Sequence, residues 1–255
     1  MSHDFTGKVA LVTGAGRGLG FAITRALISA GAVVAVNDRT VESVEAAIRR
    51  LGGGGKRAIP APADLSDAAG ARRAVAAAAM AGRIDLVVNN AVINIEAPIE
   101  ATDDEHWDQH LAIVLKAGFF TTQAALPLLL ESRGVVINIA SELGLHAIPN
   151  NVAYVAAKHG VVALTRALAI ELAGTGVRVN ALCPGTMDTE LMRECATASA
   201  DPAAYYRDFA AYHPVGRLAS PDEVADFALC LASPAAAFMT GAVVALDGGS
   251  TAGRQ

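Results

Sequence analysis

The feature that most constrains the fold is a regular alternation of short aliphatic runs with helix-length segments. The runs are rich in Val, Ile and Leu, and each is long enough for one buried strand. They lie at 8–13, 33–37, 57–61, 84–90, 135–140, 177–182 and 243–247, and the helix-length segments lie at 18–30, 41–51, 66–82, 104–131, 151–173 and 221–232. Such alternation requires crossover connections between parallel strands. It predicts an α/β fold: one doubly wound domain with a mostly seven-stranded parallel sheet and helices on both faces.

Composition supports a single large domain. The chain has 255 residues, of which 53% are hydrophobic and 18% charged, so it can form an ample core and is not of the disordered type. The weakest predicted strand, at 57–61, follows a "GGGG" turn at 52–55. A formal net charge of -5 argues against nucleic acid as a partner.

The three cysteines, Cys183, Cys195 and Cys230, favour a reducing compartment. Their number is odd and their spacing does not suit a metal, so neither a disulfide framework nor a zinc site is predicted. The first residues contain no apolar signal core, and no later stretch offers 18 uncharged apolar residues. We therefore expect a soluble cytoplasmic protein that does not bind membranes.

One segment, 186–214, breaks the alternation. It combines Met and Leu with four aromatic residues but has no clear period, and it follows the carboxyl end of a predicted strand, where doubly wound folds bind ligands. We interpret it as two short helices that form a lid over a substrate pocket. Its aromatic residues are Tyr205, Tyr206, Phe209 and Tyr212.

A glycine-rich loop, "TGAGRGLG" at 13–20, connects the first predicted strand to the first predicted helix. Glycines permit positive φ, and the missing side chains let a pyrophosphate approach the amides at the helix N-terminus. Leu19 breaks the register of the G-x-G-x-x-G fingerprint. The spacing of Gly14, Gly18 and Gly20 instead resembles the T-G-x-x-x-G-x-G motif of the short-chain dehydrogenase/reductase family, and this resemblance implies a Rossmann-like domain.

The end of the second predicted strand, "VNDR", bears on the choice of cofactor. Asp38 can accept hydrogen bonds from the adenosine ribose, and its charge repels a 2′-phosphate, so NAD is favoured over NADP. Arg39 is the opposing signal, because a neighbouring arginine holds that phosphate in relatives. Asp64 and Leu65 resemble the family's adenine-contacting pair, although Asp64 could equally belong to a helix cap.

A second constellation resembles the family's Ser…Tyr-x-x-x-Lys arrangement. Ser141 ends the fifth strong strand, thirteen residues before Tyr154, and Lys158 lies four residues further on. Hydride transfer to or from a carbonyl carbon requires a positioned acid/base for the oxygen. The resemblance implies that Tyr154 is this group, that Lys158 lowers its pKa and holds the nicotinamide ribose, and that Ser141 orients the substrate oxygen.

Further matches extend over most of the chain. "NNA" at 89–91 resembles the family's N-N-A-G, "CPGTMDT" at 183–189 resembles its P-G-x-x-x-T, and 213–249 resembles its C-terminal portion. Thr189 would bond the nicotinamide carboxamide. With the residues already named, the resemblance implies further cofactor contacts at Arg17, Leu19, Asn90, Ala91, Pro184 and Gly185.

Two positions depart from the family's pattern. Val92 replaces the glycine after N-N-A and would narrow the pocket or shift the strand end. Val114 replaces the asparagine that completes the family's catalytic tetrad, and no asparagine occurs between 95 and 137. In relatives that asparagine holds a water linking the lysine to solvent, which valine cannot do. The relay could use other groups, the enzyme could be slow, or the fold could work without proton exchange.

Family position also suggests the substrate and the assembly. Residues expected to line the substrate pocket are mostly apolar and favour a fairly apolar or cyclic secondary alcohol or its ketone: Val92, Leu143, His146, Met187, Leu191 and Met192. His106 and His110 have metal-ligand spacing but lack a third ligand, so we expect a solvated helix face and no metal site. A homo-oligomer, tetramer or dimer, is the family expectation.

The main interpretation is therefore an NAD-dependent alcohol/ketone oxidoreductase. Arg39 keeps open an NADPH-dependent carbonyl reductase. Val114 keeps open a non-redox isomerase or lyase, or a catalytically silent nucleotide-binding protein.

Overall fold

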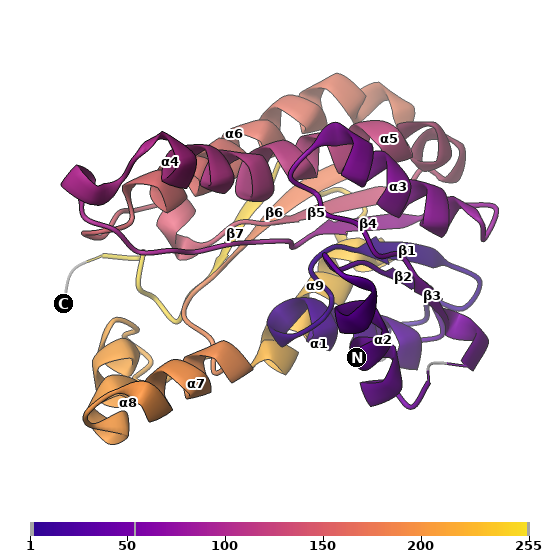
Figure 1. The fold of residues 1–255 in the computed structure, drawn as a ribbon. Helices are drawn as coiled ribbons and strands as arrows, with labels where there is room; N and C mark the ends of the chain where they lie inside the picture. The colour runs from indigo at the N-terminus through magenta and orange to yellow at the C-terminus, as the bar shows by residue number, and fades with distance from the viewer. Residues whose placement is uncertain (1–2, 54, 254–255) are drawn as a thin grey trace.

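The computed structural model describes residues 3–53 and 55–253, and its centre is one seven-stranded parallel sheet (Figure 1). The strand order is β3-β2-β1-β4-β5-β6-β7. The strands are β1 (Val9–Val12), β2 (Val33–Val36), β3 (Ala58–Pro60), β4 (Leu86–Asn89), β5 (Val135–Ile139), β6 (Arg178–Pro184) and β7 (Val243–Leu246). Every predicted strand is confirmed, including the weak third one. The "GGGG" turn falls partly on Gly54, which lies outside the described residues.

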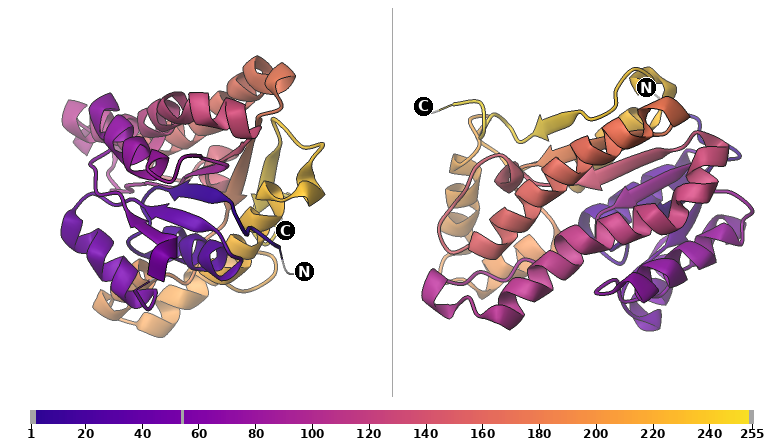
Figure 2. Two further views of the ribbon diagram at one scale, coloured as in Figure 1. Left: turned by 90° about the vertical axis from the view of Figure 1, so that its right-hand side faces the viewer. Right: turned by 90° about the horizontal axis from the view of Figure 1, so that it is seen from above.

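Helices cover both faces of the sheet, as Figures 1 and 2 show. One layer holds α1 (Gly18–Ser29), α2 (Val41–Arg50) and α9 (Pro221–Ala232). The other holds α3 (Ala68–Ala79), α4 (Asp104–His110), α5 (Ala117–Ser132) and α6 (Val152–Leu172). The remaining helices are α7 (Glu190–Ala198), α8 (Pro202–Ala211) and the short turns η1 (Gly55–Arg57), η2 (Ile99–Ala101), η4 (Glu142–Gly144), η5 (Ala173–Thr175) and η6 (Pro234–Ala236).

Two hydrophobic clusters explain why the strands are largely apolar. Val12 and Val34 are fully buried in the cluster that contains residues of α1 and α9. Their neighbours Leu11 and Ala35 are fully buried in the cluster that contains residues of α3, α5 and α6. Successive side chains point to opposite faces of a strand, so a sheet covered on both faces favours apolar residues at most strand positions. The polar exceptions include Asn89, Asn138 and Asn180.

The predicted helix 104–131 is one continuous helical run, but its hydrogen-bonding pattern changes in the middle. A π-helical segment, η3 (Leu111–Lys116), lies between α4 and α5. Each π turn spans one residue more than an α turn, so η3 changes which side chains face α6. The sequence pattern is helical on both sides of it and did not predict the change.

The same run is long and apolar enough to cross a membrane by length and composition alone. Within Asp104–Ser132 an 18-residue window reaches a mean hydropathy of 1.5, and a third of that window is buried inside the protein. The run also contains Lys116 and Glu131, and α5 contributes to the cluster under the sheet. Core helices of globular proteins pass the same test.

Strand order places the candidate site. The order runs outward from β1 in one direction and from β4 in the other, so the loops after β1 and β4 diverge. Ligands of doubly wound sheets bind in the crevice that such divergence opens at the carboxyl ends of the strands. The glycine-rich loop follows β1, and Asn90 and Ala91 follow β4, so both stand at this crevice.

Candidate active site

The glycine-rich loop is folded too tightly for side chains. Gly14 has φ +61°, and a Cβ placed there would lie 2.9 Å from the Cα of Ala91. A Cβ at Gly20 would lie 2.2 Å from the carbonyl oxygen of Gly14. The loop therefore presents bare backbone at the start of α1, which is the surface that a dinucleotide diphosphate requires.

Asn90 fastens the end of β4 to this loop. Its Nδ2 donates to the carbonyl oxygens of Thr13 at 2.9 Å and Gly14 at 3.1 Å. In return, Thr13 Oγ1 accepts from the backbone amides of Asn90 at 2.9 Å and Ala91 at 3.0 Å. Sequence reasoning did not assign a role to Thr13, and its place directly before Gly14 was the available signal.

A polar network continues from the neighbouring asparagine into the sheet. Asn89 Nδ2 donates to Asn138 Oδ1 at 2.8 Å, and Asn138 Nδ2 donates to Thr165 Oγ1 at 2.9 Å. This network links β4, β5 and α6. It fixes the relative positions of the strand that carries Asn90 and the helix that carries Tyr154 and Lys158.

Asp38 follows β2, and its side chain contacts the glycine-rich loop. Its carboxylate accepts from the amide of Gly16 at 2.9 Å and from the amide of Arg39 at 2.6 Å. A Cβ at Gly16 would lie 2.1 Å from Asp38 Oδ2, so a larger residue there would displace the carboxylate. The Arg39 side chain is exposed.

For Asp64 and Leu65, the sequence left two interpretations open for Asp64: an adenine contact or part of a helix cap. Leu65 is buried, and Asp64 is exposed and accepts from the amide of Ser66 at 2.8 Å. The cap of α3 is Asp67, which accepts from the amide of Gly70 at 2.7 Å. The alternative that Asp64 belongs to the helix cap is therefore wrong, because the N-cap is Asp67 and the helix begins at Ala68.

An acid that sequence reasoning missed lies at the N-terminus of α1. The amide of Gly18 donates to Glu190 Oε2 at 3.0 Å. Because this amide donates to a carboxylate oxygen, the N–H groups of the loop can bind an anionic oxygen. The residues present therefore fit a dinucleotide diphosphate. Arg17 precedes this position and pairs with Glu194 at 3.7 Å, while Leu19 is buried in the core beneath the loop.

The residues after β6 close the other side of the crevice. Pro184 ends β6, and the amide of Gly185 donates to the carbonyl oxygen of Leu246 at 3.1 Å. Thr189 is the N-cap of α7, and its Oγ1 accepts from the amide of Met192 at 3.3 Å. A hydroxyl that accepts this bond keeps its own proton to donate, so the cap is compatible with the predicted contact to a carboxamide.

The three predicted catalytic residues come from β5 and α6. Ser141 follows β5 and caps η4 by accepting from the amide of Leu143 at 3.1 Å. Tyr154 and Lys158 lie one turn apart on α6, and Lys158 Nζ is 5.6 Å from the centre of the Tyr154 ring. Lys158 is 2% exposed, and its Nζ donates to the carbonyl oxygen of Ile139 at 2.7 Å.

Burial dominates the electrostatics of this pair. It raises the pKa of Tyr154 to about 12, against a smaller lowering by a hydrogen bond from Ser141 and a further rise from Glu142. It lowers the pKa of Lys158 to about 7. The expectation that a neighbouring ammonium makes the Tyr154 phenol acidic is therefore not met by the protein alone, because the desolvation of both groups opposes charge.

Val114 lies in the π-helical segment and is buried. It packs in a cluster with Ala140, Ala157 and Cys183, against which Tyr154 also packs. The predicted position of the tetrad asparagine is thus in an apolar cluster against which Tyr154 packs, in surroundings that offer a side-chain amide little solvation.

His110 does not lie on a solvated helix face, so that prediction is wrong. It is fully buried: its Nδ1 donates to the carbonyl oxygen of His106 at 2.8 Å, and its Nε2 accepts from the amide of Ile95 at 3.2 Å. Its ring meets that of Tyr154 edge-on at 6.4 Å. The preceding turn of α4 satisfies Nδ1 and the loop after β4 satisfies Nε2, which gives the histidine a structural role.

Glu142, next to Ser141, is a second acid that the sequence did not single out. It is 8% exposed and bonds Ser250, and its Oε2 lies 3.9 Å from His213 Nδ1. Burial raises its pKa, while the hydrogen bond with Ser250 and the nearby His213 and His146 lower it and Asp247 raises it further. The C-terminal residues thereby reach the active-site strand end.

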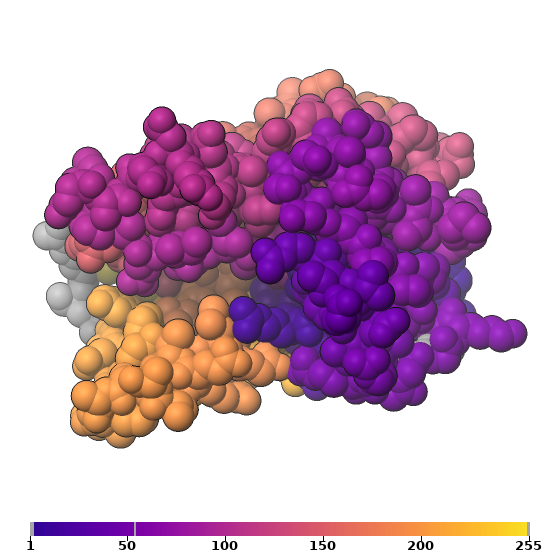
Figure 3. Space-filling view, in the orientation of Figure 1, coloured from indigo at the N-terminus to yellow at the C-terminus, as the bar shows by residue number. Residues whose placement is uncertain are grey.

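The residues expected to line the substrate pocket have unequal exposure. Leu143 and Met192 are buried, Met187 packs on the core, and His146 is half-buried. Val92 and Leu191 are 48% and 49% exposed. In Figure 3 a recess separates the α7–α8 segment, in orange, from the magenta residues of the β4–α4 connection and α4.

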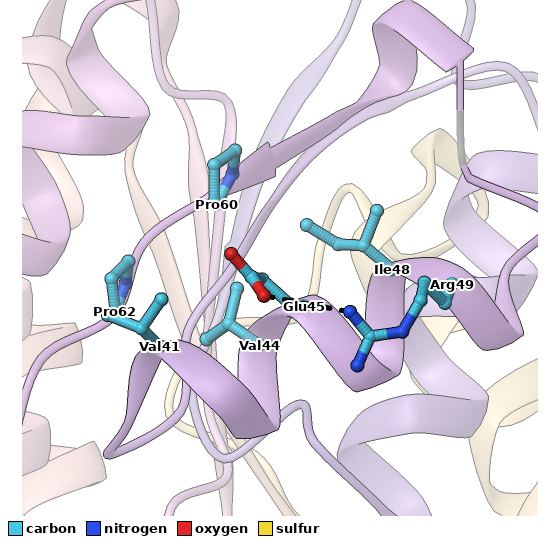
Figure 4. A pocket seen from close by; sticks show the side chains of 7 residues that line it. All are labelled: Val41, Val44, Glu45, Ile48, Arg49, Pro60 and Pro62. Atoms are coloured by element: carbon cyan, nitrogen blue, oxygen red, sulfur yellow. Dashed lines mark ion pairs between the residues drawn. The ribbon is translucent and has the colours of Figure 1, made fainter.

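Two surface cavities are lined by residues other than those predicted to line the substrate pocket. One of about 410 Å³ lies between α2 and β3, and none of the predicted site residues line it (Figure 4). The other, of about 520 Å³, is lined by residues 97–100 and 147–150 with Val152 and Val155, which flank Tyr154 along α6. The first is thus a surface feature unrelated to the predicted chemistry.

Comparison with known proteins identifies a matching family model and two similar dehydrogenases. The family model described as enoyl-(acyl carrier protein) reductase matches residues 14–251. The chain is 41% identical to D-threitol dehydrogenase of Mycolicibacterium smegmatis, over 98% of this chain and 97% of that protein. It is 37% identical to 2-(S)-hydroxypropyl-CoM dehydrogenase 3 of Xanthobacter autotrophicus, over 99% and 100%.

A solved structure agrees in fold over the whole length. A Sinorhizobium meliloti protein described as a short-chain alcohol dehydrogenase superposes with a TM-score of 0.91 at 34% identity, covering 100% of both chains. With the glycine-rich loop, the Asn90 connection and the Ser141, Tyr154 and Lys158 arrangement on one parallel sheet, the chain belongs to the short-chain dehydrogenase/reductase family of oxidoreductases.

Proposed function

We propose that the protein is an NAD-dependent oxidoreductase that transfers a hydride between the cofactor and a secondary alcohol or its ketone. The observation that carries this proposal is the position of Tyr154 and Lys158 on one side of α6, beside Ser141 at the end of β5. NAD supplies the hydride acceptor, and NADH the donor, for the carbon that bears the oxygen. The protein must supply the proton acceptor and donor for that oxygen.

In alcohol oxidation, the C–H bond gives up a hydride and the hydroxyl gives up its proton to Tyr154. In ketone reduction, Tyr154 returns a proton to the carbonyl oxygen. Ser141 steadies that oxygen by a hydrogen bond. Since burial raises the pKa of Tyr154 to about 12 in the protein alone, ionisation of the phenol requires positive charge beside it. Protonated Lys158 and the oxidised nicotinamide are the two sources.

Asp38 supports NAD as the cofactor. Its carboxylate accepts from the amide of Gly16 at 2.9 Å. In a dinucleotide complex the same carboxylate would accept hydrogen bonds from the hydroxyls of the adenosine ribose. A 2′-phosphate would meet that negative charge. The exposed Arg39 is the feature that favours the second candidate, an NADPH-dependent carbonyl reductase.

The mostly apolar lining supports a fairly apolar or cyclic secondary alcohol as substrate. We further propose that the chain is a single catalytic domain in which residues 186–214 act as the lid. We also propose that the protein is a cytoplasmic homo-oligomer, either a tetramer or a dimer, and that its substrates are small molecules only. Threitol, named for one relative, is a polyol. Small polyols therefore belong in any substrate screen beside apolar alcohols.

The test combines cofactor binding with turnover. NADH and NADPH affinities are measured by fluorescence titration, and alcohols and ketones are then screened in both directions with wild type and Tyr154→Phe. We expect tighter binding of NADH, turnover of at least one secondary alcohol, and a loss of more than about a hundredfold in Tyr154→Phe. Full turnover by Tyr154→Phe would refute the acid/base role. Cofactor binding without any turnover would instead favour the non-redox or silent protein that Val114 suggests.

A further inference from the structure

The N-terminus of α1 has no cap from its own sequence. Arg17 occupies the N-cap position but gives no side-chain hydrogen bond to the helix, and the first turn carries no acidic residue among the described residues. Amides at such a terminus favour an anion, since their N–H groups have no partner within the helix.

That anion is supplied from far along the chain, by Glu190 at the start of α7. Its Oε2 accepts from the amide of Gly18 at 3.0 Å, and its Oε1 accepts from Arg50 Nη2 at 2.7 Å. Arg50 also donates to the carbonyl oxygen of Gly16 at 3.3 Å, and its guanidinium lies 4.0 Å above the Phe21 ring. The carboxylate is thus held from two sides at the mouth of the glycine-rich loop.

The contact joins the α7–α8 segment to the cofactor loop. A Cβ at Gly18 would lie 3.7 Å from Thr189 Cγ2, so the residue before Glu190 also abuts the loop. One turn further along α7, Glu194 pairs with Arg17 at 3.7 Å. Two carboxylates on one face of α7 therefore point toward the start of α1.

Glu190 and a bound diphosphate would compete for one place. One N–H cannot serve two anionic oxygens at full strength, and two anions in contact repel each other. Burial alone would raise the pKa of Glu190, but hydrogen bonds, including those from Arg50 and Gly18, and the charge of Arg50 hold that pKa below its usual range. The side chain is therefore a carboxylate at neutral pH.

We propose that Glu190 occupies the diphosphate subsite of the unliganded protein, so that a dinucleotide must displace this carboxylate and thereby releases α7 from the glycine-rich loop. This inference rests on the proposed dinucleotide-binding function and deepens it. It makes Glu190 a residue that sets cofactor affinity, and it links cofactor binding to the segment that borders the substrate recess.

The first measurement is the affinity for NADH and NAD in Glu190→Gln, with Glu194→Gln as the matched control. Both substitutions remove one negative charge from the same face of α7, but only the first removes the carboxylate that contacts Gly18. We expect Glu190→Gln to bind both dinucleotides about three to five times more tightly than wild type, the upper part of the range for a partly exposed charge pair. Glu194→Gln should stay within about twofold.

The second measurement is thermal unfolding with and without saturating NADH. A contact made only in the unliganded protein stabilises only that state, so Glu190→Gln should lower Tm without NADH more than Glu194→Gln does. The deficit should disappear with NADH bound. Unchanged or weaker NADH binding by Glu190→Gln, or an equal Tm deficit in both states, would overturn the proposal. If wild type and both variants all failed to bind a dinucleotide, the proposed function itself would fall.

Discussion

Gly20 has room for a hydrogen atom and not for a methyl group. A Cβ there would lie 2.2 Å from the carbonyl oxygen of Gly14 and 2.5 Å from Asn90 Nδ2. Both atoms belong to the network that fixes the glycine-rich loop, so neither can move without breaking a hydrogen bond. The third glycine of the motif thus serves the packing of α1 against the loop.

We predict that Gly20→Ala lowers the free energy of unfolding by about 1 to 3 kcal/mol, the usual cost of overpacking. Gly174 is the matched control, because a Cβ there would meet no atom within 4 Å. Gly174→Ala should be neutral or stabilising by up to about 1 kcal/mol. Urea unfolding of the two variants checks this, and equal midpoints would contradict the steric account.

The pKa of Tyr154 shows how strongly the protein alone, without cofactor, shifts the titration of an acid/base group. We predict that it titrates at about 12 without cofactor, instead of at its ordinary 10.0. An acid with a raised folded-state pKa contributes stability that is present below pH 10 and is lost as the pH rises through 12. Tyrosinate absorbance of wild type minus Tyr154→Phe isolates this group, and a difference titration centred near or below 10 would refute the prediction.

At the scale of elements, the π-helical segment matters most for chemistry. It contains Val114, for which we predict correspondence to the family's tetrad asparagine, and Val114 packs in the cluster against which Tyr154 also packs. The sequence revealed the substitution but not the change of helix type, since helix periodicity is similar on both sides. π segments recur at functional sites, which agrees with its position here.

We predict that Val114→Asn raises kcat for alcohol oxidation by about ten- to a hundredfold, because it restores a group that can hold a relay water; this equals about 1.4 to 2.7 kcal/mol in barrier. Burying the amide should cost about 1 to 3 kcal/mol of stability. Val114→Ala separates the amide from the change in size. An equal rate in the two variants would show that the relay does not depend on this position.

At the scale of the whole molecule, the surface beside the edge strand β7 bears on assembly. Phe238, between η6 and β7, has a relative exposure of 105%, and Ile170, near the end of α6, is 82% exposed. Large apolar side chains and a free strand edge on one region of surface are typical of a contact between subunits.

We predict that Phe238→Ser weakens self-association and shifts the mass in sedimentation velocity from two or four chains toward one, at a protein concentration of about 1 µM. Met80 is the matched control, since it is 84% exposed at the end of α3. Met80→Ser should leave the mass unchanged. An unchanged mass for Phe238→Ser would exclude this residue from the interface.

Sequence by itself determined the sheet and its crossover helices, and it predicted a set of candidate site residues. Buried parallel strands must be continuously apolar, and glycines must stand where backbone meets backbone, so both features are written locally. Tertiary structure alone decided which groups meet. Glu190 reaches Gly18 across 172 positions, and burial in the packed chain lowers the pKa of Lys158 to about 7. Desolvation and long-range contacts depend on the packed chain, and no local pattern records them.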